Sequence, residues 1–133
     1  MAVGGDDYCF ACGTKNPIGL HLEFAPVEDK VVAKKIVPKE YQGYTDVVHG
    51  GIVTTLLDEA MGSYIQEKCN ERAMTGRLEI RYRHPTPVLR ELTISAWEES
   101  RRRNILTMHA QVETSDGTVT AEATAKFAVV SLK

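Results

Sequence analysis

The sequence predicts an α+β fold in which an antiparallel β-sheet wraps around one long, buried helix. One segment, residues 50–68, is apolar over most of its helical surface. Several other segments alternate apolar and polar residues, as half-buried strands do. Between two of them, Asp116-Gly117 is typical of a tight hairpin turn. Because a helix this apolar needs a large covering surface, we expect the strands to provide it.

Length and composition predict one domain over residues 1–133. The chain has 133 residues, 43% hydrophobic and 26% charged, with a net charge of −2. This charge gives no reason to expect a nucleic-acid partner, and no apolar stretch reaches the ~20 residues that cross a bilayer. The first residues lack the basic and apolar regions of a secretory signal. We therefore expect a cytoplasmic location and no membrane partner.

The first part of the chain is expected to contain two strands between irregular segments. Residues 1–19 are interrupted by glycines and a proline and predict an irregular N-terminal lead-in. Alternation over residues 20–24 predicts a strand, residues 26–29 a turn, and residues 31–37 a second strand. Residues 39–48 have no period and predict a loop.

Residues 50–68 form the predicted helix. Apolar residues recur at steps of four along two neighbouring rows, Ile52, Leu56, Ala60 and Val53, Leu57, Met61, Ile65. Together these rows cover more than the usual ~100° apolar stripe of a surface helix. The helix therefore belongs to the core.

Four more strands are expected after the helix. The alternating segments are residues 78–82, 92–98, 106–112 and 119–129. The last three are joined by short connections, so they should run antiparallel. Small alanines at 121, 123 and 125 would allow a bulky element to lie close to that strand.

The three cysteines do not suggest a disulfide framework. Cys9 and Cys12 have the spacing of a metal-ligand or redox pair. A structural zinc site needs four ligands, and only His21 and Cys69 are available to complete such a set. We therefore expect two thiols that pack a turn, with no metal and no cofactor, and keep a metal or redox site as the alternative.

Gly50-Gly51 opens the helix where Ser, Thr, Asp or Asn is the usual cap. Glycine leaves the first backbone N–H groups accessible, and the helix dipole adds partial positive charge there. These groups would stabilise a carbonyl oxygen that becomes an oxyanion. The alternative is a tight turn that simply requires glycine.

Asp58 lies in the most apolar part of the helix, where an unpaired carboxylate is costly. A carboxylate at such a position is a candidate base or nucleophile. The alternative is a structural ion pair with Arg77 or Arg81. Its neighbour Glu59 suits an exposed point of the helix.

Gly50 and Asp58 are too far apart to act on one carbonyl from the same helix. Eight residues of α-helix span ~12 Å. Two helices that meet antiparallel across a two-fold axis would combine Gly50 of one subunit with Asp58 of the other. The chemical interpretation therefore predicts a homodimer with shared active sites, or a tetramer of such dimers.

The sequence resembles the hotdog-fold thioesterases, in the branch of the PaaI-like acyl-CoA thioesterases. The resemblance covers about residues 9–130 and rests on His49-Gly50-Gly51, Leu56-Leu57-Asp58, and Thr75 with the segment 77–82 and Pro85. It implies a hotdog fold, an acyl-CoA substrate and hydrolysis of the thioester to free acid and CoA.

The resemblance also implies roles for single residues. The Gly50 N–H would polarise the carbonyl, and Asp58 of the partner subunit would activate water or attack. Thr75 would help to place the water, and His49 would hold the loop. Further substrate contacts are implied for Gln42, Gly43, Gly51, Glu59, Gly76, Arg77, Arg83 and Pro85. Relatives carry an Asn or Gln where Gly43 aligns here.

Three alternatives remain open at this stage. A hotdog dehydratase or hydratase would use His49 with a carboxylate to move protons. A non-catalytic acyl-CoA binding module would keep the fold without turnover, and a purely structural oligomer would bind no acyl-CoA. Arg81, Arg83 and His84, and the run Arg101–Arg103, are basic groups that could contact CoA phosphates or simply be solvated. Tyr41, Tyr44, Met61 and Tyr64 are candidates for an acyl pocket or for the core.

Overall fold

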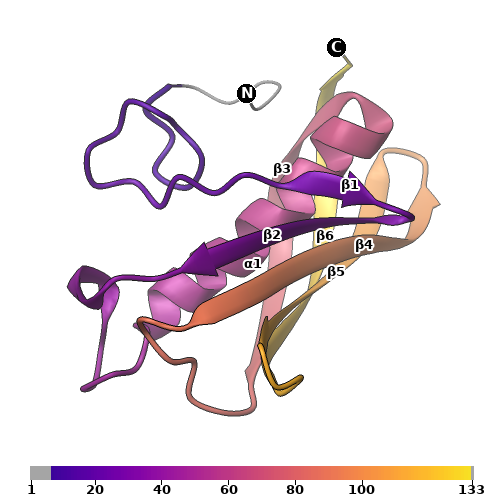
Figure 1. Ribbon diagram of the computed structural model, residues 1–133. Coiled ribbons are helices and arrows are strands. Elements are labelled where there is room, and N and C mark those ends of the chain that lie inside the picture. The colour runs from indigo at the N-terminus through magenta and orange to yellow at the C-terminus, as the bar shows by residue number, and fades with distance from the viewer. Residues whose placement is uncertain (1–6, 133) are drawn as a thin grey trace.

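The computed structural model describes residues 7–132. One α-helix, α1 (Gly50–Tyr64), continues as a π-helical segment, η2 (Ile65–Cys69), and lies across a six-stranded sheet (Figure 1). The strands are β1 (Ala25–Val27), β2 (Lys30–Ile36), β3 (Glu71–Tyr82), β4 (Glu91–Arg102), β5 (Ile105–Thr114) and β6 (Val119–Leu132). A short 3-10 helix, η1 (Lys39–Tyr41), lies between β2 and α1.

All neighbouring strands in the sheet are antiparallel, in the order β1-β2-β4-β5-β6-β3. The predicted antiparallel arrangement of the last three strands is therefore confirmed. β3, the first strand after the helix, pairs with β6, the last strand, and forms one edge of the sheet. This edge strand carries part of the candidate site.

The core lies between α1 and the sheet. Leu56, Leu57, Ala60 and Met61 of the helix are completely buried, as are Ile94 and Met108 of the sheet. Ala121, Ala123 and Ala125 of β6 are also buried and leave room for the helix. Burial of large aliphatic side chains, worth about 1.5–3 kcal/mol each, is the main stabilising contribution of such a core.

The strand expected at residues 20–24 was a wrong prediction. Leu20 and Leu22 are buried, as the alternation indicated, but His21 between them has a φ of 55°. The Leu20 and Leu22 N–H groups donate to the Phe10 and Ala11 carbonyls, so this segment is held by the lead-in rather than by the sheet. The first strand instead forms at β1, which overlaps the turn expected at residues 26–29.

β3 begins at Glu71, seven residues before the predicted strand. Thr75 pairs with Phe127 and Arg77 with Lys126, so Gly76 between them is an extra residue without its own partner in β6. Such a bulge reverses the side-chain alternation beyond it. The pattern in the sequence is therefore regular only after Gly76.

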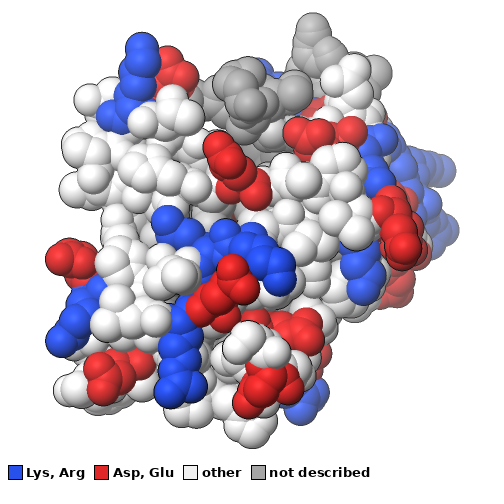
Figure 2. Space-filling view, in the orientation of Figure 1, with Lys and Arg blue, Asp and Glu red and all other residues white. Residues whose placement is uncertain are grey.

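The described part of the lead-in, residues 7–19, contains no helix or strand, as expected; residues 1–6 lie outside the described residues. Figure 1 shows this segment, in indigo, as a loop outside the sheet. Acidic and basic side chains are interspersed over the face shown in Figure 2. Among residues 7–132, no helix has both the length and the apolar character that a membrane crossing requires.

Candidate active site

His49 caps the N-terminus of α1 and leaves one backbone N–H group unused. Its Nδ1 accepts a hydrogen bond from the Gly51 N–H (2.9 Å), and its carbonyl accepts from Ile52 and Val53 (2.9 and 3.0 Å). Within residues 7–132, no acceptor faces the Gly50 N–H. The single free donor of the first turn therefore belongs to Gly50, where the helix dipole is positive.

Gly50 and Gly51 differ in how much space a Cβ atom would have at each position. A Cβ on Gly51 would lie 3.2 Å from the His49 Nδ1, which is tighter than most Cβ contacts, so the capping turn favours glycine there. A Cβ on Gly50 would meet only the Tyr82 ring, at 3.7 Å or more, which is an ordinary contact. A tight turn therefore explains Gly51 but not Gly50.

Tyr82 is a site residue that the sequence did not reveal. Its hydroxyl donates to the Gly50 carbonyl (3.0 Å) and shares a hydrogen bond with the Thr54 hydroxyl (2.7 Å). The aromatic ring thus fixes the start of α1 against the end of β3. In the sequence, Tyr82 was indistinguishable from an ordinary inward-facing strand residue.

A pocket of about 680 Å³ opens at this end of the helix. Its walls come from the loop before α1, from α1 itself and from the segment that follows β3. The lining residues are Gly43, Tyr44, Val47, Val48, His49, Gly50, Val53, Tyr82, Arg83, His84, Pro85 and Thr86. The structure therefore brings Gly43, His49, Gly50, Arg83 and Pro85 together, as five of the predicted site residues.

Asp58 and Thr75 form a second group. The Thr75 hydroxyl, in the first half of β3, donates to the Asp58 Oδ1 (2.7 Å). Thr75 precedes the bulge at Gly76 and Tyr82 follows it, so both side chains point to α1 although one number is odd and the other even. A bulge next to a functional side chain is a common way to direct it.

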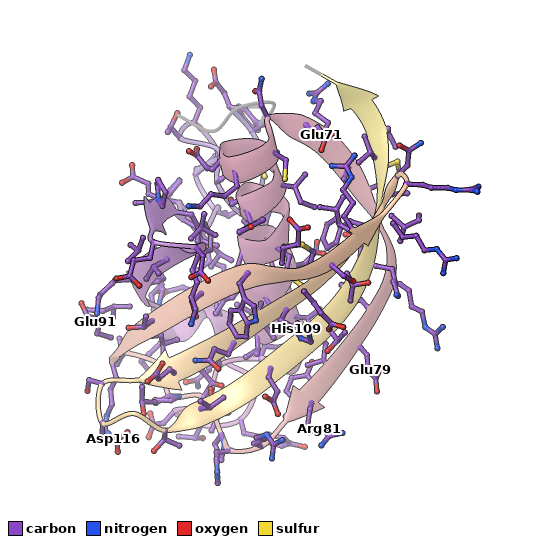
Figure 3. All side chains as sticks on the ribbon, turned by 90° about the vertical axis from the view of Figure 1, so that its right-hand side faces the viewer. Glu71, Glu79, Arg81, Glu91, His109 and Asp116 are labelled. Carbon is purple, nitrogen blue, oxygen red and sulfur yellow. The ribbon has the colours of Figure 1, made fainter. Side chains whose placement is uncertain are left out.

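The alternative role for Asp58, an ion pair with Arg77 or Arg81, does not occur among the described residues. Asp58 is half-buried, and its hydrogen-bond partner is a hydroxyl rather than a cation. Arg81 and Glu79 project from the outer side of β3 (Figure 3). Among the described residues, the Asp58 carboxylate therefore has one hydrogen-bond donor, the Thr75 hydroxyl, which binds Oδ1.

Residues 45–121 match the sequence profile of the thioesterase superfamily. The chain belongs to the thioesterase superfamily. A crystal structure of a thioesterase superfamily protein superimposes on it with a TM-score of 0.85, at 25% identity over 92% of this chain. This chain spans 60% of that protein's length. The central helix and the six-stranded antiparallel sheet are the hotdog fold of the superfamily, as predicted.

Two other superfamily structures share the fold at lower identity. One is the Streptococcus mutans protein smu.793 bound to acetyl CoA, with a TM-score of 0.76, 20% identity, and coverage of 84% of this chain and 90% of that one. The other is a hypothetical thioesterase from Streptococcus pneumoniae with coenzyme A, with a TM-score of 0.78, 21% identity and the same coverage. No protein of curated function matches the sequence.

Besides Asp58 and Thr75, the predicted site residues outside the pocket are Gln42, Gly51, Glu59, Gly76 and Arg77. The Gln42 side-chain oxygen accepts from the Asp46 N–H (3.1 Å) and closes the loop before the helix. The Gly51 N–H is occupied by His49. Gly76 and Arg77 lie at the β3 edge, beside Thr75. Gly76 and Arg77 thus accompany the Asp58 group, whereas Gln42 and Gly51 shape the helix entry.

The basic groups are partly committed to ion pairs. Arg83 lines the pocket and donates to Glu122 on β6. Arg101 makes a two-pronged pair with Glu71, at 2.5 and 3.0 Å, which joins β4 to the start of β3. Arg101 therefore acts in the fold, and Arg83 retains only part of its donors for a phosphate.

The expectation that Glu59 forms an exposed point of the helix was wrong. Glu59 is half-buried against the N-terminal loop, where its carboxyl interacts with Cys12 and Ser63. Burial raises the pKa of Glu59. Of the aromatic and Met candidates for an acyl pocket, Tyr44 lines the pocket, Met61 is in the core, and Tyr41 bonds the Ile18 and Gly19 carbonyls.

Proposed function

We propose that this chain hydrolyses acyl-CoA thioesters to the free acid and CoA. The observation that carries the proposal is the free Gly50 N–H at the positive end of α1, beside a pocket of about 680 Å³. Membership of the thioesterase superfamily supports it. Relatives of the same fold hold acetyl CoA and coenzyme A, which supports CoA as the carrier group.

In the proposed mechanism, the Gly50 N–H donates to the thioester carbonyl oxygen and stabilises the negative charge that develops there. In one route, the Asp58 carboxylate takes a proton from water as the water attacks the carbonyl carbon; the carbon–sulfur bond then breaks, and the CoA thiolate takes up that proton. In the other route, the carboxylate attacks that carbon itself and the carbon–sulfur bond breaks, which leaves a mixed anhydride on Asp58 and a CoA thiolate. Water then hydrolyses the anhydride, which restores the carboxylate, releases the acid and supplies the proton for the thiolate. Thr75 holds Oδ1 of Asp58, which leaves Oδ2 for the water.

His49 acts as a positioning residue in this mechanism. Because Nδ1 accepts from the Gly51 N–H, the neutral ring carries its proton on Nε2. The ring thereby fixes the turn that presents the Gly50 N–H. The dehydratase or hydratase alternative would instead require the histidine itself to exchange a proton with the substrate, through Nε2.

We propose that each active site combines two subunits. Gly50 and Asp58 are ~12 Å apart along α1, and both of their strand partners, Tyr82 and Thr75, come from β3. β3 is twelve residues long, has one unpaired edge in the described chain, and exposes Met74 and Tyr82 (64% and 55%). A second copy that covers this edge across a two-fold axis would bring Gly50 of one subunit to Asp58 of the other.

The test is thiol release from short, medium, long and aromatic acyl-CoA esters. Asp58→Asn keeps the shape of the side chain but removes its basicity, so turnover should fall by about 10²–10⁴-fold. Asp29→Asn, which changes an exposed carboxylate in the turn between β1 and β2, is the matched control and should keep full turnover. The best ester would identify the acyl class.

Two results would contradict the proposal. Full turnover in a folded Asp58→Asn variant would remove the carboxylate from the mechanism. No release from any ester would leave hydrolysis unsupported. Thermal unfolding would then distinguish an acyl-CoA binding module from a purely structural oligomer. A ligand at 100 times its dissociation constant stabilises by about 2.7 kcal/mol, so a shift with acyl-CoA would indicate a binding module.

A further inference from the structure

The N-terminal loop brings two thiols to a carboxyl group of the central helix. The Sγ atoms of Cys9 and Cys12 and a carboxylate oxygen of Glu59 all lie within 4.8 Å of one another, and all three residues are half-buried. We propose that Cys9, Cys12 and Glu59 form a binding site for zinc or a similar thiophilic divalent cation. This site is separate from the pocket at Gly50 and does not depend on the proposed hydrolysis.

The loop is built so that both thiols face the same point. The Gly13 N–H donates to the Cys9 carbonyl (2.8 Å), and the Lys15 N–H donates to the Asp7 carbonyl (2.9 Å). Gly13 is buried, and a Cβ there would lie 2.3 Å from the Asp7 carbonyl oxygen and 2.5 Å from the Cys9 nitrogen. Only glycine fits this turn, which fixes the backbone on both sides of Cys12.

The position of the loop on α1 is also fixed without the cation. Ala11 and Leu20 are buried in the core, and the Leu20 N–H donates to the Phe10 carbonyl (2.8 Å). Phe10 packs edge-on against Tyr41, with ring centroids 6.2 Å apart. The two thiols are therefore held over Glu59 by packing that does not involve the ligand atoms. A preorganised set of ligands reduces the entropy cost of binding a cation.

The separations suit a tetrahedral ion. Zinc–sulfur bonds of about 2.3 Å place two thiolates about 3.7 Å apart, and a zinc–oxygen bond of about 2.1 Å is typical for carboxylates. The ligand atoms of Cys9, Cys12 and Glu59, all within 4.8 Å of one another, are near these separations. Three protein ligands leave the fourth position to water, which is a known arrangement for zinc.

The ligands considered from the sequence alone do not complete the set. The His21 Nε2 is hydrogen-bonded to the Asn16 carbonyl (2.8 Å). Cys69 follows Glu59 by ten residues, so it lies ~15 Å further along the helix. Glu59 is the third ligand instead, and it comes from a distant part of the sequence with no spacing signal.

The surroundings of Cys12 and Glu59 provide no positive charge that pairs with the Glu59 carboxyl among the described residues, since no lysine, arginine or histidine forms an ion pair with it there. The Cys12 thiol and the Glu59 carboxyl are both half-buried. A divalent cation bound by the two thiols and the carboxyl would supply that positive charge.

The experiment uses the full chain, reduced and free of metal, with cadmium as a spectroscopic probe and zinc as the second ion. Cadmium thiolates absorb in the ultraviolet, so a titration reports the stoichiometry directly. We expect one cadmium per chain, displaced by zinc, and one zinc per chain by elemental analysis. Cys12→Ser should abolish the absorption, and Glu59→Gln should weaken binding by about tenfold or more, as loss of even an outer-shell partner does.

Cys69→Ser is the matched control because it removes the third thiol and leaves the cluster intact. It should bind cadmium as the unchanged chain does. Circular dichroism and thermal unfolding check that each variant is folded, and Glu59→Gln tests the site if Cys12→Ser does not fold. The proposal is wrong if the reduced chain shows no thiolate absorption with cadmium, if Cys69→Ser abolishes it, or if Glu59→Gln binds zinc and cadmium unchanged.

Discussion

At the scale of single residues, the free N–H of Gly50 can be removed without changing the helix. Proline is favoured at the first helical position, where its missing N–H costs no helical hydrogen bond. The preceding His49 has φ −56° and ψ 137°, which a following proline tolerates. Gly50→Pro therefore deletes the proposed oxyanion donor and keeps α1.

We expect Gly50→Pro to lower kcat for the best acyl-CoA ester by about 10²–10³-fold, the cost of one oxyanion-hole donor. Gly50→Ala is the control, because it adds a Cβ in ordinary contact with Tyr82 and keeps the N–H. Steady-state measurement of kcat for both variants tests whether the Gly50 N–H contributes to catalysis. Equal losses in the two variants would show that the pocket is sensitive to bulk, and the N–H would then have no special role.

Thr75 offers a second test at this scale. Thr75→Val keeps the shape of the side chain but removes the hydroxyl that donates to Asp58. A hydrogen bond to a charged group is worth about 1.5–3 kcal/mol, so kcat should fall about tenfold or more with little change in KM. Thr75→Ser should restore the rate. A Thr75→Val variant with unchanged kcat would show that Asp58 needs no such support.

The sequence identified Gly50 and Asp58 because both break a local rule. Glycine replaces a usual cap, and a carboxylate interrupts an apolar face. Tyr82 and Glu59 break no such rule, since Tyr82 fits the strand alternation and Glu59 fits a polar helix position. Their contacts come from tertiary packing with Gly50 and Cys12, which no local pattern encodes.

At the scale of elements, the helix and the strands β4, β5 and β6 followed from periodicity, because each has one face on a common core. The strand expected at residues 20–24 failed for a different reason. Burial of Leu20 and Leu22 produces alternation whether or not the backbone pairs with a sheet, and His21 has a left-handed conformation. The early start of β3 was hidden by the bulge at Gly76, which shifts the alternation.

The Glu71–Arg101 pair joins β3 to β4 and makes stability depend on pH. The hydrogen bond from Arg101 lowers the pKa of the Glu71 carboxyl in the folded chain. The unfolded value is about 4.3. The pair therefore stabilises the fold above that pH, and the contribution is lost as the pH falls through the lower, folded-state pKa.

Glu71→Gln should consequently reduce the Tm at pH 7, and the difference from the unchanged chain should shrink as the pH falls below about 4. Thermal unfolding at a series of pH values measures it. Glu79→Gln is the control, because Glu79 lies exposed on the same strand and points to solvent (Figure 3). A difference that stays constant down to the lowest pH would show that the Glu71 charge does not contribute.

At the scale of the whole molecule, the proposed site is divided between the middle of β3 and its last residue. Tyr82 holds the Gly50 half and Thr75 holds the Asp58 half. The sheet order places this strand at an edge, next to the last strand in the sequence. Neither fact was predictable from the sequence, because the pairing of β3 with β6 joins segments that three turns and two strands separate. The second copy stays a prediction from the helix rise, which places Gly50 and Asp58 ~12 Å apart along α1.

Complementation between two inactive variants tests this division. In a mixed dimer of Gly50→Pro and Asp58→Asn chains, one site would carry both substitutions and the other would carry neither. Co-expression with two different affinity tags isolates the mixed dimer, which should recover about half of the activity of the unchanged dimer. Each parent variant should stay inactive, and so should a mixed dimer in which one chain carries both substitutions and the other carries Asp58→Asn. If Gly50 and Asp58 acted within one chain, every site in the mixed dimer would contain one substitution, and no activity would return.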